Sequence, residues 1–207
     1  MAKKTAQRLP QPMRPSGRVG RIFGWLMARL NKPAYRWTVD QLRSIQPKSI
    51  LEIGFGTGHL LSLAIRKLKP KPKRVAGRDP SDLMVETAQK RLRRFRKKVA
   101  LDIAKGDDSA LPEGPFDAIV ALHSFQFWAD PTATLAKLRR MLTPEGRLIL
   151  VLRRHYSGRV SKWIPNPLSH SADEISATCA AAEAAGFTLV GMKGISKSSQ
   201  GLVLACG

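Results

Sequence analysis

The sequence has few cysteines, few aromatic side chains and no long apolar run. Its 2 cysteines, Cys179 and Cys206, stand apart from any C-x-x-C or Cys/His cluster. This pattern excludes a disulfide scaffold and a zinc site of ordinary ligand spacing, so we expect no metal site and a reducing, cytoplasmic location. A membrane-spanning helix needs about 18 or more consecutive apolar residues, so we expect none here.

Acidic residues are scarce, and their distribution along the chain is uneven. The 207 residues carry 36 Lys+Arg against 15 Asp+Glu, a net charge of +21, and no acid precedes Asp40. Residues 1–15 are basic and proline-rich and are not followed by an apolar segment, so we predict a mobile basic tail and no secretory signal. The excess of charge bears on partners and not on the fold.

A second basic block runs from residue 66 to residue 98, with fourteen Lys/Arg against three acids. Apolar residues recur within it at steps of three and four, which predicts an amphipathic helix over residues 81–97. These apolar residues are Met84, Ala88, Leu92, Phe95 and Val99. The cluster from Lys90 to Lys98 lies mainly on the opposite side of this helix. It is either a solvated helix face or a surface for RNA or anionic lipid.

Strand and helix patterns alternate from residue 47 to residue 207, which predicts one α/β domain. Expected strands are 49–53, 74–78, 99–104, 116–122, 147–152, 187–192 and 201–206, and expected helices are 59–68, 81–97, 131–142 and 171–185. This alternation indicates a Rossmann-like, seven-stranded, mainly parallel sheet with helices on both faces. Residues 16–46 suggest two helices, broken near 31–33, which we interpret as an N-terminal helical cap over the site.

The predicted strands end in loops that suit ligand binding. The first loop, residues 52–58, starts with the acid Glu52 and is rich in glycine, which lets backbone approach a ligand closely. The G-x-G-x-x-G/A pattern of dinucleotide-binding loops, aligned from Gly54, expects glycine or alanine at its sixth position. This chain has His59 there, which disfavours an NAD(P) oxidoreductase. Asp79 ends the second strand. Its carboxylate either accepts hydrogen bonds from ribose hydroxyls or caps the next helix, and Ser81 could cap that helix instead. Asp107 follows the third strand.

Taken in order, these segments resemble class I S-adenosylmethionine-dependent methyltransferases, specifically the small-molecule and quinone-type methyltransferase 11-like group. The matching pieces are residues 51–58, 77–81 with Met84, 106–107 with 111–112, 116–117 and 142–146. The resemblance implies S-adenosylmethionine as the cofactor: the glycine loop and its acid hold the methionine end, Asp79 the ribose and Asp107 the adenine. The implied cofactor-binding residues are Glu52, Gly54, Phe55, Gly56, Gly58, Asp79, Pro80, Asp107 and Asp108.

The expected function is in-line methyl transfer to a small-molecule or lipid-like acceptor. A sulfonium methyl group is already activated, so alignment matters more than side-chain chemistry. His123, after the fourth strand, is the candidate catalytic base or else a packing residue. Phe125, Phe127 and Trp128 either line the acceptor pocket or belong to the core. His155 and Tyr156 are weaker candidates for acceptor contacts.

Two motifs typical of methylation on nucleic-acid bases are missing. The fourth strand is followed by residues 122–125, Leu-His-Ser-Phe, and not by an Asn/Asp-Pro-Pro-aromatic stretch, and no Pro-Cys nucleophile is present. Nucleic acid is therefore a possible but not favoured partner. The alternatives are an RNA-directed methyltransferase that uses the basic surface and a non-catalytic adenosyl-binding module. Nothing in the sequence identifies the acceptor atom or the oligomeric state.

Overall fold

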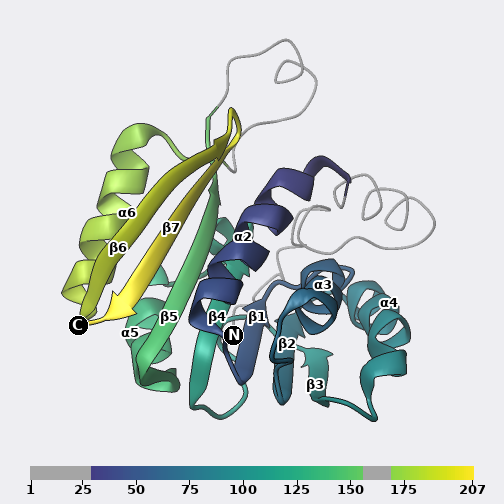
Figure 1. Cartoon of the computed structure of the whole chain (residues 1–207). Helices are drawn as coiled ribbons and strands as arrows, with labels where there is room; N and C mark the ends of the chain where they lie inside the picture. The colour runs from purple at the N-terminus through teal and green to yellow at the C-terminus, as the bar shows by residue number, and fades with distance from the viewer. Residues whose placement is uncertain (1–28, 156–168) are drawn as a thin grey trace, which may run out of the picture.

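The computed structural model describes residues 29–155 and 169–207 (Figure 1). The predicted tail, residues 1–15, lies outside the described residues, as do residues 16–28 of the predicted cap and Tyr156. Within the described ranges, no helix combines the length and the apolar character needed to cross a membrane.

Seven strands form a single sheet in the order β3-β2-β1-β4-β5-β7-β6. The strands are β1 (Ser49–Ile53), β2 (Arg74–Asp79), β3 (Ala100–Lys105), β4 (Phe116–Leu122), β5 (Leu142–Arg153), β6 (Phe187–Ser196) and β7 (Ser199–Cys206). Strands β1 to β5 run parallel, and β7 runs antiparallel to both of its neighbours. The prediction of a mainly parallel, seven-stranded sheet is confirmed.

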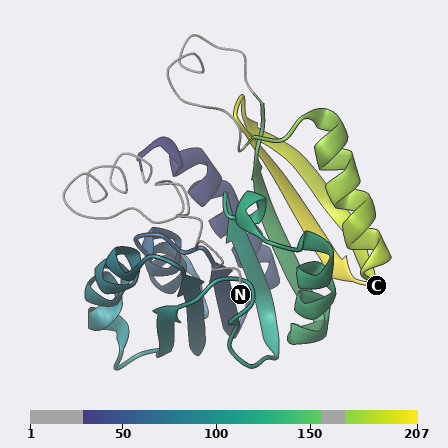
Figure 2. The same ribbon diagram turned by 180° about the vertical axis from the view of Figure 1, so that it is seen from behind.

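Helices cover both faces of this sheet, as predicted. They are α2 (Lys32–Ile45), α3 (His59–Lys67), α4 (Asp82–Leu92), α5 (Pro131–Met141) and α6 (Ala172–Ala184), with short 3₁₀ turns η1 (Arg93–Phe95) and η2 (Phe125–Phe127). Helices α2, α3 and α4 lie on one face, and α5 and α6 on the other (Figures 1 and 2). Strand residues alternate between the two cores, so that Ile50 packs beneath α2–α4 while Leu51 packs beneath α5 and α6.

Local sequence explains where the helices begin. Pro33 stands in the first turn of α2, which suits its missing N–H and accounts for the predicted break near residues 31–33. The hydroxyl of Ser81 caps α4 and the carboxylate of Asp130 caps α5. Ser171 and Glu174 form a capping box at the start of α6. Because Ser81 is the cap of α4, Asp79 is left to act elsewhere.

Helix α2 lies along the sheet face and contacts α3, β4, β5 and β6. The Trp37 ring fits so closely against Gly201 of β7 that a Cβ at Gly201 would collide with it. This part of the predicted cap therefore covers a face of the sheet. That residues 16–28 extend over the carboxyl ends of the strands stays a prediction.

The later strands are longer than predicted. Strand β5 begins at Leu142 instead of Arg147, because Leu142 pairs with Phe116 before an irregularity shifts the register. Strand β6 continues to Ser196, past two register shifts, and β7 starts at Ser199. These extensions bring Ser199 beside Arg153, at the same edge of the sheet as the loop after β4.

Candidate active site

The glycine loop after β1 lies at the carboxyl edge, where the chain order of the parallel strands reverses between β1 and β4. Ligands of open α/β sheets bind at this place. Gly54, Gly56 and Gly58 all have positive φ, at 74°, 53° and 67°. A Cβ at Gly54 would lie 2.5 Å from the Cβ of Ser124, so the loops after β1 and β4 touch only because this residue is glycine.

Two buried carboxylates stand beside this loop. Asp79 accepts hydrogen bonds from the backbone N–H of Gly56, at 2.8 Å, and from that of Ser81, at 2.9 Å. Burial nonetheless raises the pKa of Asp79 to about 6. Glu52 is only 2% exposed, and its Oε2 atom finds no hydrogen-bond partner among the described residues. The pair therefore has capacity to accept hydrogen bonds from a ligand.

Glu52 is the more deeply buried acid of the two. Burial raises its pKa well above the ordinary value, and the charge of Asp79 adds to the effect. The pKa of Tyr35, on α2, is raised to about 12, first by burial and then by the charge of Glu52. The Tyr35 phenol therefore lies close enough to Glu52 to be affected by its charge. A cationic or hydroxyl-bearing ligand would relieve the cost of burying these charges together.

Asp107 and Asp108 follow β3 and point to different partners. Asp107 is exposed, and one of its oxygens accepts hydrogen bonds from the N–H and hydroxyl of Ser109. Asp108 is buried and accepts a hydrogen bond from the Thr134 hydroxyl of α5 at 2.7 Å. Asp107 is therefore exposed after β3, and its role as the adenine ligand stays a prediction. The Asp108 side chain fastens the loop to α5, and its role as a cofactor ligand stays a prediction.

His123 leaves β4 in a left-handed conformation, with φ at 55°. The backbone N–H of His123 donates to the Val151 carbonyl, and the Nε2 atom of its ring lies 3.1 Å from the Ser199 hydroxyl of β7. Burial, with a contribution from Arg153, lowers the pKa of His123 to about 3. The ring is neutral at neutral pH and a weak base, so its surroundings favour hydrogen bonding over the predicted proton abstraction.

Comparison with known proteins agrees with this geometry. The family model described as a methyltransferase domain matches residues 51–148. The uncharacterized methyltransferase YdaC of Bacillus subtilis is 28% identical over 132 residues, which cover 64% of this chain and 71% of that protein. The demethylmenaquinone methyltransferase of Thermotoga maritima is 28% identical over 139 residues, covering 61% of this chain and 57% of the enzyme.

A solved methyltransferase shares the fold. The S-adenosylmethionine-dependent methyltransferase of Aquifex aeolicus superposes with a TM-score of 0.63 at 20% identity, covering 77% of this chain and 82% of that one. The chain is an S-adenosylmethionine-dependent methyltransferase, and its fold is that of the solved enzyme.

The residues at the carboxyl edge fit the cofactor of this methyltransferase family, S-adenosylmethionine. The buried Oε2 atom of Glu52 lacks a partner among the described residues, and Gly54 and Gly56 of the glycine loop are partly exposed. Nothing lies within 4 Å of a Cβ built at Gly56, so a ligand has room there. Pro80 is half-buried directly after Asp79. The Phe55 side chain is buried in the core beneath α2, α3 and α4, and its predicted contact with the cofactor stays a prediction.

Arg78 stands next in sequence to Asp79, the predicted ribose ligand, and the structure shows what balances its charge. In the structure its guanidinium pairs with both carboxylate oxygens of Asp102 on β3, at 2.9 and 3.0 Å. Asp102 therefore balances the Arg78 charge in this methyltransferase.

The aromatic residues after β4 belong to the core more than to an open pocket. Phe125 and Trp128 are 6% and 7% exposed, and their rings lie 4.9 Å apart. Phe127 is half-buried in the same turn. His155, at the end of the first described range, is exposed. The alternative that Phe125 and Trp128 pack in the core is the one that the structure supports.

Several residues near the site gave no signal in the sequence. Ser124 donates its hydroxyl proton to the Ile53 carbonyl and so joins β4 to the glycine loop. Arg91 of α4 donates to the Thr57 hydroxyl of that loop at 2.8 Å. The Tyr35 ring lies 4.8 Å from the ring of His59. Each contact joins segments far apart in the chain, so no local pattern could predict it.

Proposed function

We propose that this methyltransferase transfers a methyl group from S-adenosylmethionine to a small-molecule or lipid-like acceptor. The observation that carries the proposal is the buried pair Glu52 and Asp79, with an oxygen unpartnered among the described residues, beside a glycine loop at the reversal point of the sheet. When bound, the cofactor supplies a methyl group already activated by a positive sulfur. The protein then has to align the acceptor in line with that group and exclude water.

The proposed cofactor contacts follow from the hydrogen-bond capacity of each residue. The free Oε2 of Glu52 would accept from the ammonium group at the methionine end, because a buried carboxylate is stabilised by a cation. Asp79 would accept from the ribose hydroxyls while its bonds to Gly56 and Ser81 hold it in place. Asp107, exposed at the rim, would accept from the adenine amino group.

The acceptor is proposed to contact the loop after β4. Two buried polar atoms of this loop, besides the core residue Trp128, have no hydrogen-bond partner among the described residues: His123 Nδ1 and Gln126 Oε1. The amide nitrogen of Gln126 donates to the His123 carbonyl at 2.8 Å, which fixes the direction of its free oxygen. Because buried polar atoms normally have partners, these two favour an acceptor with hydroxyl or carbonyl groups.

A small acceptor is also consistent with one of the relatives. The Thermotoga enzyme is by name a demethylmenaquinone methyltransferase, which indicates a lipophilic quinone-type acceptor for that enzyme. The neutral His123 ring suits such an acceptor as a hydrogen-bonding partner. The proposed step forms a bond between the methyl carbon and an acceptor atom as the bond from that carbon to sulfur breaks. Any proton on the acceptor passes to water or to a neighbouring group.

Incubation of cell extract with methyl-labelled S-adenosylmethionine and the purified chain tests this proposal. We expect label in a low-molecular-weight or lipid fraction, as a product heavier by one methyl group, and much less label with the Asp79→Ala variant at limiting cofactor concentration. Label found only in RNA or protein would contradict the proposed acceptor class, and equal labelling by the variant would contradict the proposed site.

A further inference from the structure

A dense group of cations covers the end of α4 and the turn that follows it. The cationic α4 surface consists of Lys90, Arg91, Arg93, Arg94, Arg96, Lys97 and Lys98. All are exposed except Arg91, which is half-buried, and Arg93 and Arg94 lie directly after the helix. The opposite side of the helix, including Ala88 and Leu92, is fully buried against the domain. The apolar residues therefore serve the fold, whereas most of the cations on the other side are exposed to solvent.

Few carboxylates balance this surface. Lys90 pairs with Glu86 at 2.6 Å, on an exposed part of α4. Among the described residues, Arg93, Arg96, Lys97 and Lys98 form no ion pair. Burial lowers the pKa of Arg91, and the charges of Arg94 and of Arg66 on α3 lower it further. The cations repel one another, so a bound polyanion would stabilise the surface.

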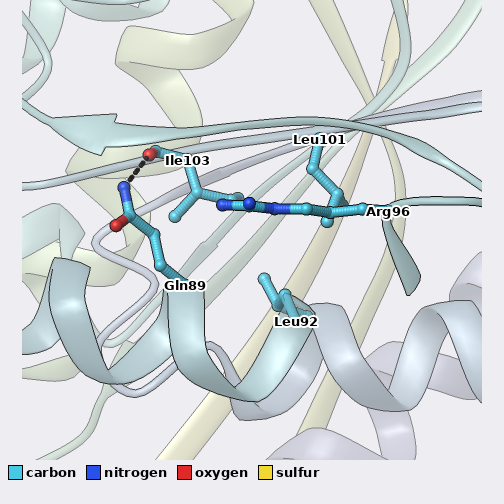
Figure 3. Close-up of a pocket in the computed structure, with 5 residues that line it drawn as sticks. All are labelled: Gln89, Leu92, Arg96, Leu101 and Ile103. Carbon is cyan, nitrogen blue, oxygen red and sulfur yellow. Dashed lines mark hydrogen bonds between the residues drawn. The ribbon is translucent and has the colours of Figure 1, made fainter. Parts of the chain in front are cut away.

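The surface borders an open hollow of about 520 Å³, whose described lining is Lys90, Arg91, Arg93 and Arg94. This volume lies within the range of about 300–1,000 Å³ typical of ligand sites. A second cavity of about 60 Å³, under Arg96, is too small for a ligand. There the Arg96 side chain lies extended between Leu92 and Leu101, while Gln89 donates to the Ile103 carbonyl at 2.9 Å (Figure 3). The hollow is therefore the concave part of the surface, and Arg96 continues it along the turn.

We propose that the cationic α4 surface binds the phosphate backbone of RNA without regard to base sequence. Four of its seven cations are arginines, whose planar guanidinium groups suit phosphate oxygens. The half-buried Phe95 ring is covered by the Arg94 guanidinium, at 4.8 Å from the ring centroid. Within the described surface, no exposed aromatic ring is thus left to stack with bases, and contacts go to the backbone alone.

A membrane surface fits the same observations less well. The exposed large apolar residues of the described chain are Leu30, Val190 and Met192, and none lies on α4 or in the turn after it. A helix that docks on a bilayer buries an apolar face in it, whereas the apolar face of α4 is already buried in the domain. The concave, arginine-lined hollow suits a chain of phosphates better than a flat bilayer.

The surface also touches the cofactor loop. Arg91, which lines the hollow, donates to Thr57 of the glycine loop at 2.8 Å. The proposed RNA site is therefore continuous with the proposed cofactor site but does not share its carboxylates. The inference goes beyond the proposed methyl transfer, because it concerns what tethers the enzyme and not what it methylates.

Fluorescence anisotropy with a short, labelled single-stranded RNA of mixed sequence tests this proposal on the full chain. The test variant reverses three charges, Arg93→Glu with Arg94→Glu and Lys97→Glu. The matched control reverses three exposed charges elsewhere, Lys69→Glu with Lys71→Glu and Lys73→Glu, and so has the same net charge. We expect the affinity of the test variant for RNA to fall at least about tenfold. The slope of log affinity against log salt should become shallower by about 0.7 for each phosphate that the variant no longer neutralises.

The control variant should bind RNA within about twofold of the unmodified chain, since screening limits the effect of distant charges. Equal losses in both variants would overturn the proposal, because net charge alone would then explain binding. Binding to anionic phosphatidylglycerol vesicles that RNA does not displace would also overturn it, in favour of a membrane surface. Calorimetry with S-adenosylhomocysteine should be unchanged in both variants, so failure here is distinguishable from failure of the proposed methyl transfer.

Discussion

The backbone N–H of Gly56 donates a hydrogen bond to the carboxylate of Asp79 at 2.8 Å, which fastens the glycine loop after β1 to the end of β2. The other oxygen of Asp79 accepts from Ser81, the residue that caps α4. One side chain therefore fixes the loop and stands beside the first turn of α4. Burial of Asp79 to 6% exposure raises its pKa to about 6, and these two hydrogen bonds, which lower it, offset only part of that rise.

The raised pKa of Asp79 predicts how stability depends on pH. Without cofactor, the folded protein keeps a proton on Asp79 up to about pH 6, whereas the unfolded chain releases it near the ordinary value of 3.8. Stability from this group is therefore present at low pH and is lost as the pH rises through that window. In Asp79→Asn the group no longer titrates. The Tm of the variant minus that of the unmodified chain should rise between about pH 4 and pH 6, by differential scanning fluorimetry, and a flat difference would contradict the raised pKa.

Two glycines of the loop should respond differently to alanine. Gly54→Ala combines a left-handed backbone with a Cβ 2.5 Å from that of Ser124, whereas Gly56→Ala has the strained backbone but open space. We expect about 1–2 kcal/mol of destabilisation for Gly56→Ala from the left-handed conformation alone, and more for Gly54→Ala. Urea denaturation measures both. Adding Ser124→Gly to Gly54→Ala should recover part of the extra loss, and the absence of any recovery would show that this contact is not the cause.

His123 is expected to stay neutral throughout the working pH range, since burial lowers its pKa to about 3. The pH profile of kcat/KM should then show no ionisation from this residue between about pH 5 and pH 8. His123→Asn keeps a hydrogen-bonding side chain and should retain more activity than His123→Leu. A profile with a pKa near 6.5 that disappears in His123→Asn would restore the role of catalytic base.

The N-terminal part of α2 should respond to the cofactor. Tyr35 contacts His59 and lies near Glu52, so filling the site should steady this turn. Hydrogen exchange over residues 31–37 should slow when S-adenosylhomocysteine is added. Exchange that is identical with and without the cofactor would make α2 a structural cover only.

Deleting residues 1–15, the predicted mobile tail, should leave methyl transfer unchanged.

The sequence predicted the central strands and the ligand edge well, for a physical reason. Strands β1 and β4 match their predicted ranges, since they are buried on both faces and show as short apolar runs. Where a strand ends in glycine or an acid, the topology alone places that residue at the carboxyl edge. The positions of Glu52, Asp79 and Asp107 followed from this rule.

What the sequence did not predict depends on pairing between distant segments. The early start of β5 rests on the pairing of Leu142 with Phe116, which local periodicity does not contain. The direction of the Asp108 side chain is set by its hydrogen bond with Thr134 of α5, a helix that follows β4 and η2 in the chain. Likewise, the perturbed pKa of His123 arises from burial by the folded chain and from Arg153.

Cofactor binding, measured by titration calorimetry, tests the central claim most directly. The unmodified chain should bind S-adenosylmethionine and S-adenosylhomocysteine and should not bind NAD. Asp79→Ala should weaken the binding of both adenosyl ligands by about 1–3 kcal/mol, because their hydroxyls lose a buried partner. The control Glu145→Gln removes an exposed carboxylate at the opposite end of the sheet and should leave the Kd unchanged. Tighter binding of NAD than of either adenosyl ligand, or an unchanged Kd in Asp79→Ala, would contradict the account.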